Sequence, residues 1–295
     1  MSHPGIATVR ELIGASVRAE QPTLEERREW LESLGEVMPP PTGVVIEDLT
    51  LAGRPASRTT PGDPGPGTVL YLHGGAYVSG SLVSHRGVVA RFALAADTVV
   101  HALDYRLGPE HPFPAAVDDA VAAFRELDEA GLGPIAVAGD SAGGGLALAT
   151  LLALRDAGGT QPACGVALSP WADLTQSGAT YESRAEADPL LTREGLDEAA
   201  GMYLGDGDAT DPLASPMLGD LSGLPPVAIE VGDGEVLLDD SRVTAERIEA
   251  AGGEVSLEVW PEMLHVFQAF PPDLVPEADQ SLERVGRFVH HHLSA

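Results

Sequence analysis

The chain has 295 residues, 44% of them hydrophobic, and a formal net charge of −28. This length suits one large domain with an insertion, or two small domains. All 17 basic residues are arginine, against 45 acidic residues. A surface this acidic repels phosphate backbones and anionic lipids. We therefore expect neither a nucleic-acid partner nor binding to a membrane surface.

The single cysteine, Cys164, excludes an internal disulfide framework. It opens an apolar run over 164–168, where a buried and inert thiol is expected. The first residues lack a charged start followed by an apolar core, and no apolar run reaches transmembrane length. We therefore expect a cytoplasmic protein without membrane insertion.

Two helices are predicted between residues 6 and 36. The first has apolar residues at helical spacing, namely Val9, Leu12, Ile13 and Val17. The second opens at Thr23, with Glu25 and Glu26 in its first turn. Three prolines, 39–41, end this segment. Residues 1–40 are too few for an independent domain, so we expect them to form part of a cap on the body.

Strands and helices alternate through the rest of the chain. The predicted strands are 44–51, 68–72, 98–103, 134–138, 164–168, 227–231 and 255–260. The predicted helices are 82–95, 115–127, 145–154, 193–203, 240–251 and 278–291. This alternation indicates βαβ units and a mostly parallel sheet, so the fold class is α/β. Residues 172–220 are polar and broken by prolines, which is typical of an insertion.

Residues 139–143, Gly-Asp-Ser-Ala-Gly, lie between a predicted strand and a predicted helix. They fit G-x-S-x-G in the strand–turn–helix context of a nucleophile elbow. At such a corner the Ser141 side chain would project into the open, beside the free N–H groups of a helix N-terminus. The alternative is a chance match in a chain with 34 glycines.

A second glycine motif, His73-Gly74-Gly75-Ala76-Tyr77, follows the strand 68–72. Ligands bind at the carboxyl ends of parallel strands, where Gly74 and Gly75 would expose backbone N–H groups. Together with the N–H of Ala142 they could surround an oxyanion. A tight glycine turn is the plainer alternative.

These motifs resemble those of the hormone-sensitive-lipase-like esterases of the α/β-hydrolase superfamily. The resemblance extends to 104–115, where Gly108 replaces the family's usual alanine, and to 169–171 and 214–216. It implies a mostly parallel eight-stranded sheet flanked by helices, with a helical cap. The catalytic domain would be 41–295 with a cap insertion at about 177–212. The N-terminal helices fit the family's cap only by position.

The acid and the base of such a site follow the serine in the order Ser, Asp/Glu, His. The family usually has Asp-Pro-Leu-x-Asp after the strand 227–231, which aligns with 235–239 and makes Glu235 the acid. Asp233 and Asp239 remain rivals. His265 lies in the loop after the last strand, which carries the base in this fold.

The other histidines are interpreted as structural or solvated. Three of them, 290–292, point in different directions on a helix and are read as a solvated tail, so no metal is expected. His73 and His111 would orient backbone in their loops, and His3, His85 and His101 belong to no motif. Asp140 and Glu110 are expected to order the loops around the serine.

The resemblance implies a serine carboxylesterase for short- to medium-chain acyl esters that needs no cofactor. Alternatives are a lactone or acetyl-group hydrolase, a serine peptidase or amidase, and a non-catalytic small-molecule-binding homologue. The presence of His265 argues against the last. Pocket candidates, which could equally be cap core, are Tyr77, Leu190, Met202 and Tyr203. A small-molecule ester is the expected partner, and a homodimer through the last strand and helix is possible by analogy.

Overall fold

The computed structural model describes residues 3–16 and 22–295. Val17, expected in the first helix, lies outside these ranges. The strands are β1 (Val44–Leu51), β2 (Arg54–Pro61), β3 (Thr68–Leu72), β4 (Val99–Leu103), β5 (Ile135–Asp140), β6 (Cys164–Leu168), β7 (Val227–Gly232) and β8 (Val255–Trp260). The helices are α1 (Pro4–Ser16), α2 (Leu24–Val37), α3 (Arg86–Ala96), α4 (Ala115–Glu129), α5 (Ala142–Ala157), α6 (Thr180–Ser183), α7 (Arg193–Leu204), α8 (Leu238–Ala250) and α9 (Glu277–Leu293), with short 3-10 turns η1 (Pro216–Leu218) and η2 (Phe267–Ala269).

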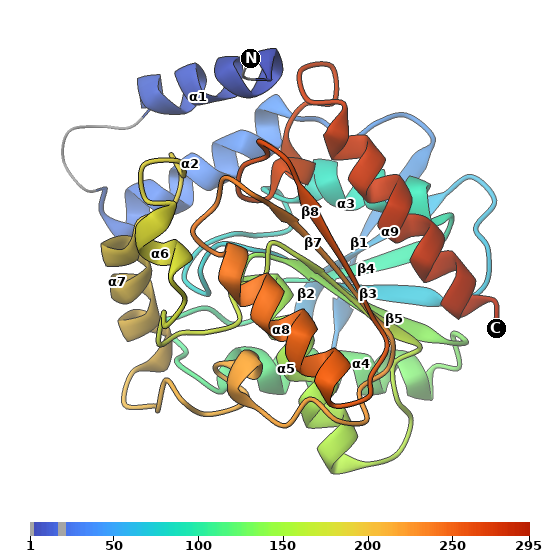
Figure 1. Ribbon diagram of the computed structural model, residues 1–295. Coiled ribbons are helices and arrows are strands. Elements are labelled where there is room, and N and C mark those ends of the chain that lie inside the picture. Colours follow the sequence, from blue (N-terminus) through green and yellow to red (C-terminus); the bar gives the residue numbers. More distant parts are fainter. Residues whose placement is uncertain (1–2, 17–21) are drawn as a thin grey trace.

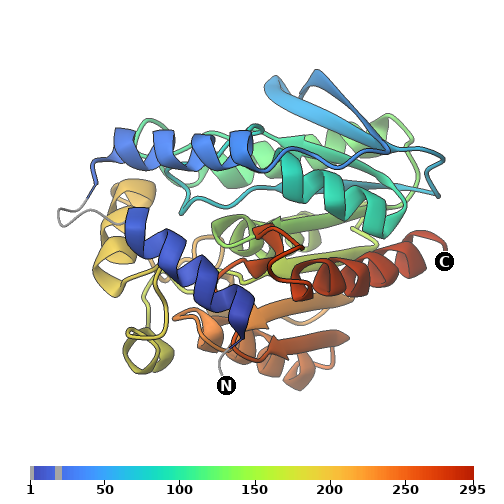
Figure 2. The same ribbon diagram turned by 90° about the horizontal axis from the view of Figure 1, so that it is seen from above.

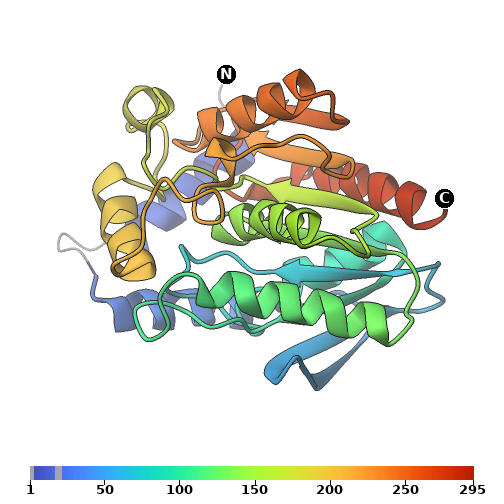
Figure 3. The same ribbon diagram turned by 90° about the horizontal axis from the view of Figure 1, so that it is seen from below.

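All eight strands form one sheet in the order β1-β2-β4-β3-β5-β6-β7-β8. The strands from β4 to β8 in this order pair in parallel, whereas β1 and β2 form an antiparallel hairpin that also pairs antiparallel with β4. Helices α3 and α9 cover one face (Figure 2), and α4, α5 and α8 cover the other (Figure 3). The predicted α/β-hydrolase fold with an eight-stranded, mostly parallel sheet is confirmed (Figure 1).

The sequence pattern missed β2. Its residues, RPASRTTP, show no apolar alternation, because the buried positions include Ser57 and Thr59. The strand is held instead by its pairing with β1 on one side and β4 on the other. Helix starts also differ from the predicted ones, most at α3, which begins at Arg86 instead of 82, and at α5, which begins at Ala142 instead of 145.

The helices α2 and α7 lie over the carboxyl ends of the central strands. Helix α2 begins with a capping box between Thr23 and Glu26, as its sequence indicates. Arg28 on this helix donates to the carbonyls of Val78 and Gly108 (2.8 and 3.0 Å) and binds both carboxylate oxygens of Glu110. Glu110 therefore orders a loop, as expected, by fixing α2 on the body.

Helix α1 packs on the loop that follows β8 and carries His265. Its Ile6 and Val9 are buried against Met263, Leu264 and Phe267. Among the described residues, no helix is long and apolar enough to cross a membrane. The single thiol, Cys164, is buried in β6, and burial raises its pKa to about 12, as expected for an inert cysteine.

Candidate active site

Ser141 occupies a strained corner between β5 and α5. Its backbone lies at φ 54° and ψ −123°, a conformation that residues other than glycine rarely adopt. The flanking glycines allow it. A Cβ on Gly139 would come within 2.2 Å of the Gly143 carbonyl oxygen, and one on Gly143 within 2.0 Å of that of Leu72. The G-x-S-x-G motif therefore forms a nucleophile elbow.

The loop after β3, residues 73–77 (here the oxyanion loop), passes directly beside this corner. Gly75, Ala76 and Tyr77 all have positive φ, at 120°, 55° and 63°. Positive φ is rare for residues other than glycine, so the loop holds a strained conformation at Ala76 and Tyr77. In the described part of the chain, the N–H groups of Gly75, Ala76 and Ala142 donate to no protein acceptor, so they are available to a ligand.

Gly74 differs from the expectation drawn from its motif. Its N–H, expected to face an oxyanion, donates to Asp140 Oδ1 at 3.2 Å. A Cβ on Gly74 would lie 2.3 Å from Asp140 Oδ2, so glycine is required for this close approach. Gly74 thus fixes the loop, and Ala76 takes its place among the candidate donors.

Asp140 is the buried support of the oxyanion loop, in the structural role expected for it. Besides Gly74 N–H it accepts from the hydroxyl of Tyr71 at 2.8 Å, and its Oδ2 lies 3.3 Å from His85 Nε2. Burial acts to raise the pKa of Asp140, but His85 and Tyr71 together lower it, so the carboxylate stays charged. His85, which the sequence placed in no motif, therefore supports the oxyanion loop indirectly, through its contact with Asp140.

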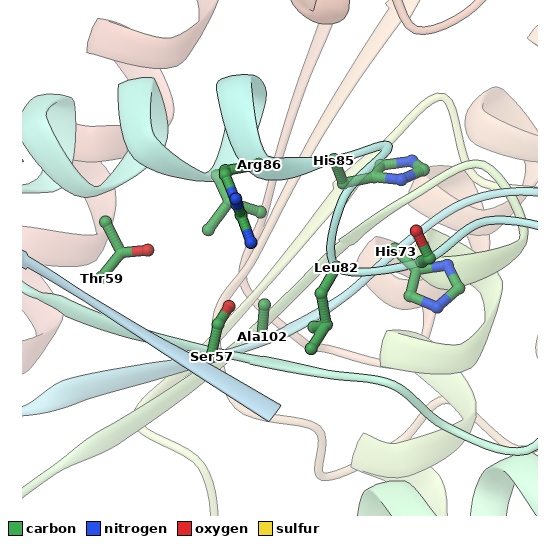
Figure 4. Close-up of a pocket in the computed structure, with 9 residues that line it drawn as sticks. Ser57, Thr59, His73, Leu82, His85, Arg86 and Ala102 are labelled. Atoms are coloured by element: carbon green, nitrogen blue, oxygen red, sulfur yellow. The ribbon is translucent and has the colours of Figure 1, made fainter. Parts of the chain in front are cut away.

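His73 contacts the backbone of its own loop, as predicted. Its Nδ1 lies 2.8 Å from the Gly74 carbonyl oxygen, and its ring stacks on Tyr105 at 4.4 Å. Burial lowers the pKa of His73 to about 4, so it is neutral at ordinary pH. A small cavity behind the oxyanion loop is lined by His73 and His85 together with residues of β2 and α3 (Figure 4).

Ser141, His265 and Glu235 form one hydrogen-bonded chain. His265 Nε2 lies 2.8 Å from Ser141 Oγ, and its Nδ1 lies 2.7 Å from Glu235 Oε2. Glu235 is fully buried. The two rival carboxylates are engaged elsewhere, since Asp233 accepts from the N–H of Glu262 and Asp239 from that of Thr180.

Ser169 is a supporting residue whose role the sequence did not reveal. It is fully buried with φ 47°, and its hydroxyl donates to Glu235 Oε1 at 2.8 Å. The same oxygen of Ser169 accepts the N–H of Val266 at 3.2 Å, and Gly232 N–H supplies Oε1 with a second donor at 2.7 Å. Ser169 thus joins the acid to the loop that carries His265. Its Ser-Pro-Trp motif was the only signal.

The pKa of His265 is raised above its usual value of 6.5. Burial by itself lowers this pKa, but the hydrogen bond and the charge of Glu235 outweigh it, and the charges of Asp188 and Asp140 add to the rise. When His265 is neutral and its Nδ1–H donates a hydrogen bond to Glu235, its Nε2 carries no proton and can accept the hydroxyl proton of Ser141. The arrangement is suited to proton transfer during nucleophilic attack.

The four pocket candidates divide into two pairs. The rings of Tyr77 and Tyr203 stack at 3.9 Å and both side chains are buried, so they form a packed joint between the oxyanion loop and α7. Leu190 and Met202 are half-buried. The N–H of Leu190 donates to Asp188, whose other oxygen accepts the N–H of Val236, next to Glu235. The interpretation as cap core therefore suits the two tyrosines.

No group of three or more metal-ligating side chains is present in residues 3–16 and 22–295. His290, His291 and His292 lie in the last turn of α9 and are not members of the Ser141–His265–Glu235 chain. Because the Ser141–His265–Glu235 arrangement needs no metal to activate its nucleophile, the chemistry open to this site is acyl transfer through a serine.

A strained serine elbow, a buried acid–base pair and free N–H donors at the carboxyl ends of a parallel sheet define a serine hydrolase of the α/β class. A family model described as alpha/beta hydrolase fold matches residues 69–269. An acetyl-hydrolase of Streptomyces hygroscopicus is 44% identical over 98% of this chain and 97% of its own length. An esterase of Acinetobacter venetianus is 34% identical over 88% of this chain and 87% of its own.

Solved structures agree with these relatives. An esterase from the bacterial hormone-sensitive lipase family is 41% identical, with a TM-score of 0.95 over 99% of both chains. EstE5, in a crystal soaked with p-nitrophenyl butyrate, is 39% identical, with a TM-score of 0.94 over 99% of both chains. The chain therefore belongs to the hormone-sensitive-lipase-like esterases of the α/β-hydrolase superfamily. It is a carboxylic-ester hydrolase.

Proposed function

We propose that this protein is a serine carboxylesterase that hydrolyses short- to medium-chain acyl esters through Ser141, His265 and Glu235. The observation that carries the proposal is the continuous chain of hydrogen bonds, 2.8 and 2.7 Å long, from the elbow serine through the imidazole to a buried carboxylate. A small-molecule ester is its substrate.

In the first half-reaction Ser141 Oγ attacks the ester carbonyl while His265 Nε2 takes the hydroxyl proton. Glu235 accepts the Nδ1 hydrogen bond and stabilises the imidazolium that forms. The oxyanion receives N–H groups of Gly75, Ala76 and Ala142, each worth about 3 kcal/mol by analogy with similar sites. His265 then protonates the leaving alcohol, and water releases the acyl group by the same route.

The preference for small acyl groups is supported by the cap. We propose that residues 1–40 and about 177–212 form this cap on a catalytic domain of 41–295. Helix α7 is fixed close over the site, because Tyr203 stacks on Tyr77 and its carbonyl accepts the N–H of Phe113 at 2.7 Å. The relatives called acetyl-hydrolase and the butyrate ester soaked into EstE5 point the same way. Acetyl-group hydrolysis is therefore the second candidate.

The test is hydrolysis of p-nitrophenyl esters from acetyl to palmitoyl. We expect kcat/KM to be highest for acetyl to hexanoyl and to fall at least about 100-fold at palmitoyl, because a cap packed over the site would hinder a long acyl chain. A maximum at palmitoyl would contradict the proposed acyl size. Absence of turnover on every ester by folded protein would overturn the esterase proposal and favour a binding role.

The pH dependence follows from the raised pKa of His265. The imidazole must be neutral to accept the serine proton, so kcat/KM should rise with pH and level off above the pKa of the free enzyme. Its midpoint should lie above the usual 6.5. Rates measured from about pH 5 to pH 9 test this. A midpoint below 6.5 would mean that Glu235 does not dominate the environment of the base.

We also propose that the protein forms a homodimer. In the part of the chain that the structure describes, β8 ends the sheet and pairs with β7 alone, so its outer backbone groups form an open edge. Antiparallel pairing of this edge with that of a second copy would close it.

A further inference from the structure

The loop that carries His265, residues 261–266 (here the base loop), is strained. Glu262 and Val266 lie in the left-handed region, at φ 62° and 47°. For a β-branched residue such as valine this conformation is unfavourable and persists only when its surroundings impose it. The groups that hold the ends of the base loop therefore fix where the imidazole of His265 lies.

Both ends of the base loop are tied to one carboxylate, that of Glu230 on β7. Trp260, the last residue before the loop, donates its indole N–H to Glu230 Oε2. On the other side, Gln268 donates to Ser281 Oγ at 3.0 Å, and Ser281 donates to the same Oε2 at 3.2 Å. Arg284 on α9 donates to Oε1 at 3.0 Å.

The position of Glu230 is unusual for an acid. Only 1% of it is exposed, and it shares its face of β7 with Ala228, toward the apolar side of α9. Burial raises its pKa to about 7 although three donors oppose the rise. A carboxylate at this depth costs free energy unless donors satisfy it. Two of its donors, Trp260 and Ser281, are the groups that connect it to the two ends of the base loop.

Glu230 also touches the support of the acid. Its backbone carbonyl accepts the N–H of Ser169 at 2.7 Å, and Ser169 contacts both Glu235 and the base loop. Glu230 thus connects both to the base loop and to Ser169, the support of Glu235, without contacting His265 itself.

We propose that Glu230 is a positioning residue for His265, holding both ends of the base loop through Trp260 and the Ser281–Gln268 pair. This inference rests on the proposed role of His265 as general base. It predicts a lower kcat, because a base displaced by a fraction of an ångström accepts the serine proton less well. KM should change little, because the substrate site stays intact.

The test compares Glu230→Leu and Trp260→Phe with the wild type on p-nitrophenyl acetate. Each should lower kcat about 10-fold or more while KM changes less than about twofold. The double variant should be no worse than the poorer single variant, because both remove the same tie. Active-site titration with a fluorophosphonate corrects each kcat for the fraction of folded protein.

Glu230→Gln is the conservative rescue. Its amide oxygen can accept from Trp260 and Ser281, while Arg284, which is 39% exposed, turns to water. It should keep at least about a third of the wild-type kcat. Glu258→Leu is the matched control, since Glu258 also lies near Arg284 (3.6 Å) but does not hold the base loop. It should leave kcat unchanged.

Wild-type kcat in folded Glu230→Leu, or equal losses in the Gln and Leu variants, would overturn the inference. If Glu230→Leu does not fold, Trp260→Phe decides in the same way. The low-field proton resonance of His265 Nδ1–H gives a readout without turnover, and in Trp260→Phe it should shift or broaden. Inactive wild-type protein would defeat the proposed function, whereas an unchanged resonance in Trp260→Phe would defeat this inference.

Discussion

Glutamine in place of Glu235 should lower kcat about 10³- to 10⁴-fold and leave the fold intact. The reason is a forced tautomer. Oε1 of Glu235 accepts from both Ser169 Oγ and Gly232 N–H. In the variant these two donors hold the amide oxygen at that place, so the amide NH₂ faces His265 Nδ1. The imidazole must then carry its proton on Nε2, where it cannot accept the proton of Ser141.

Hydrolysis of p-nitrophenyl acetate by Glu235→Gln measures this loss, and its pH profile adds a second check. Because Glu235 raises the pKa of His265, the acid limb should move to lower pH in the variant. Asp233→Asn is the matched control, because the amide oxygen of asparagine can still accept the N–H of Glu262 that Asp233 accepts. If Asp233→Asn lost activity and Glu235→Gln kept it, the acid would be misassigned.

Ser141→Ala should reduce kcat by about 10⁶-fold, to the level left by the remaining donors. The fold should survive, because the Ser141 hydroxyl caps no helix and, within residues 3–16 and 22–295, its hydrogen-bond partner is His265 alone. A fluorophosphonate should label the wild type once and the variant not at all, as judged by intact mass.

Ser169→Ala is the control for this labelling. Ser169 is also buried and also belongs to the site, but its hydroxyl is committed to Glu235 and Val266. The variant should still be labelled, with a lower kcat. Labelling of Ser141→Ala, or its loss in Ser169→Ala alone, would show that the nucleophile is another residue.

The sequence was sufficient for the parts of the site that depend on local pattern. The buried strands β3 and β6 are short apolar runs, and the elbow follows from glycine spacing around Ser141. His265 follows from its position after the last strand. Glu235 required the family's motif, because nothing local separates it from Asp233 and Asp239.

The rest depends on contacts between distant segments. Strand β2 is buried by pairing and not by apolar character. The N–H of Gly74 is engaged because Asp140, 66 residues away, points at it, and no pattern around Gly74 reports this. Ser169 and Glu230 act through partners on other strands and helices for the same reason.

The stack between Tyr77 and Tyr203 connects the oxyanion loop to α7. Tyr77 directly follows the N–H donors of Gly75 and Ala76, and its ring rests on a ring of α7 at 3.9 Å. A substrate bulky enough to push α7 outward would pull Tyr77 away from its partner and tilt those donors. Oversized esters should therefore bind but turn over slowly. The protein would then discriminate against them through a lower kcat, because the N–H donors of Gly75 and Ala76 would no longer point at the oxyanion.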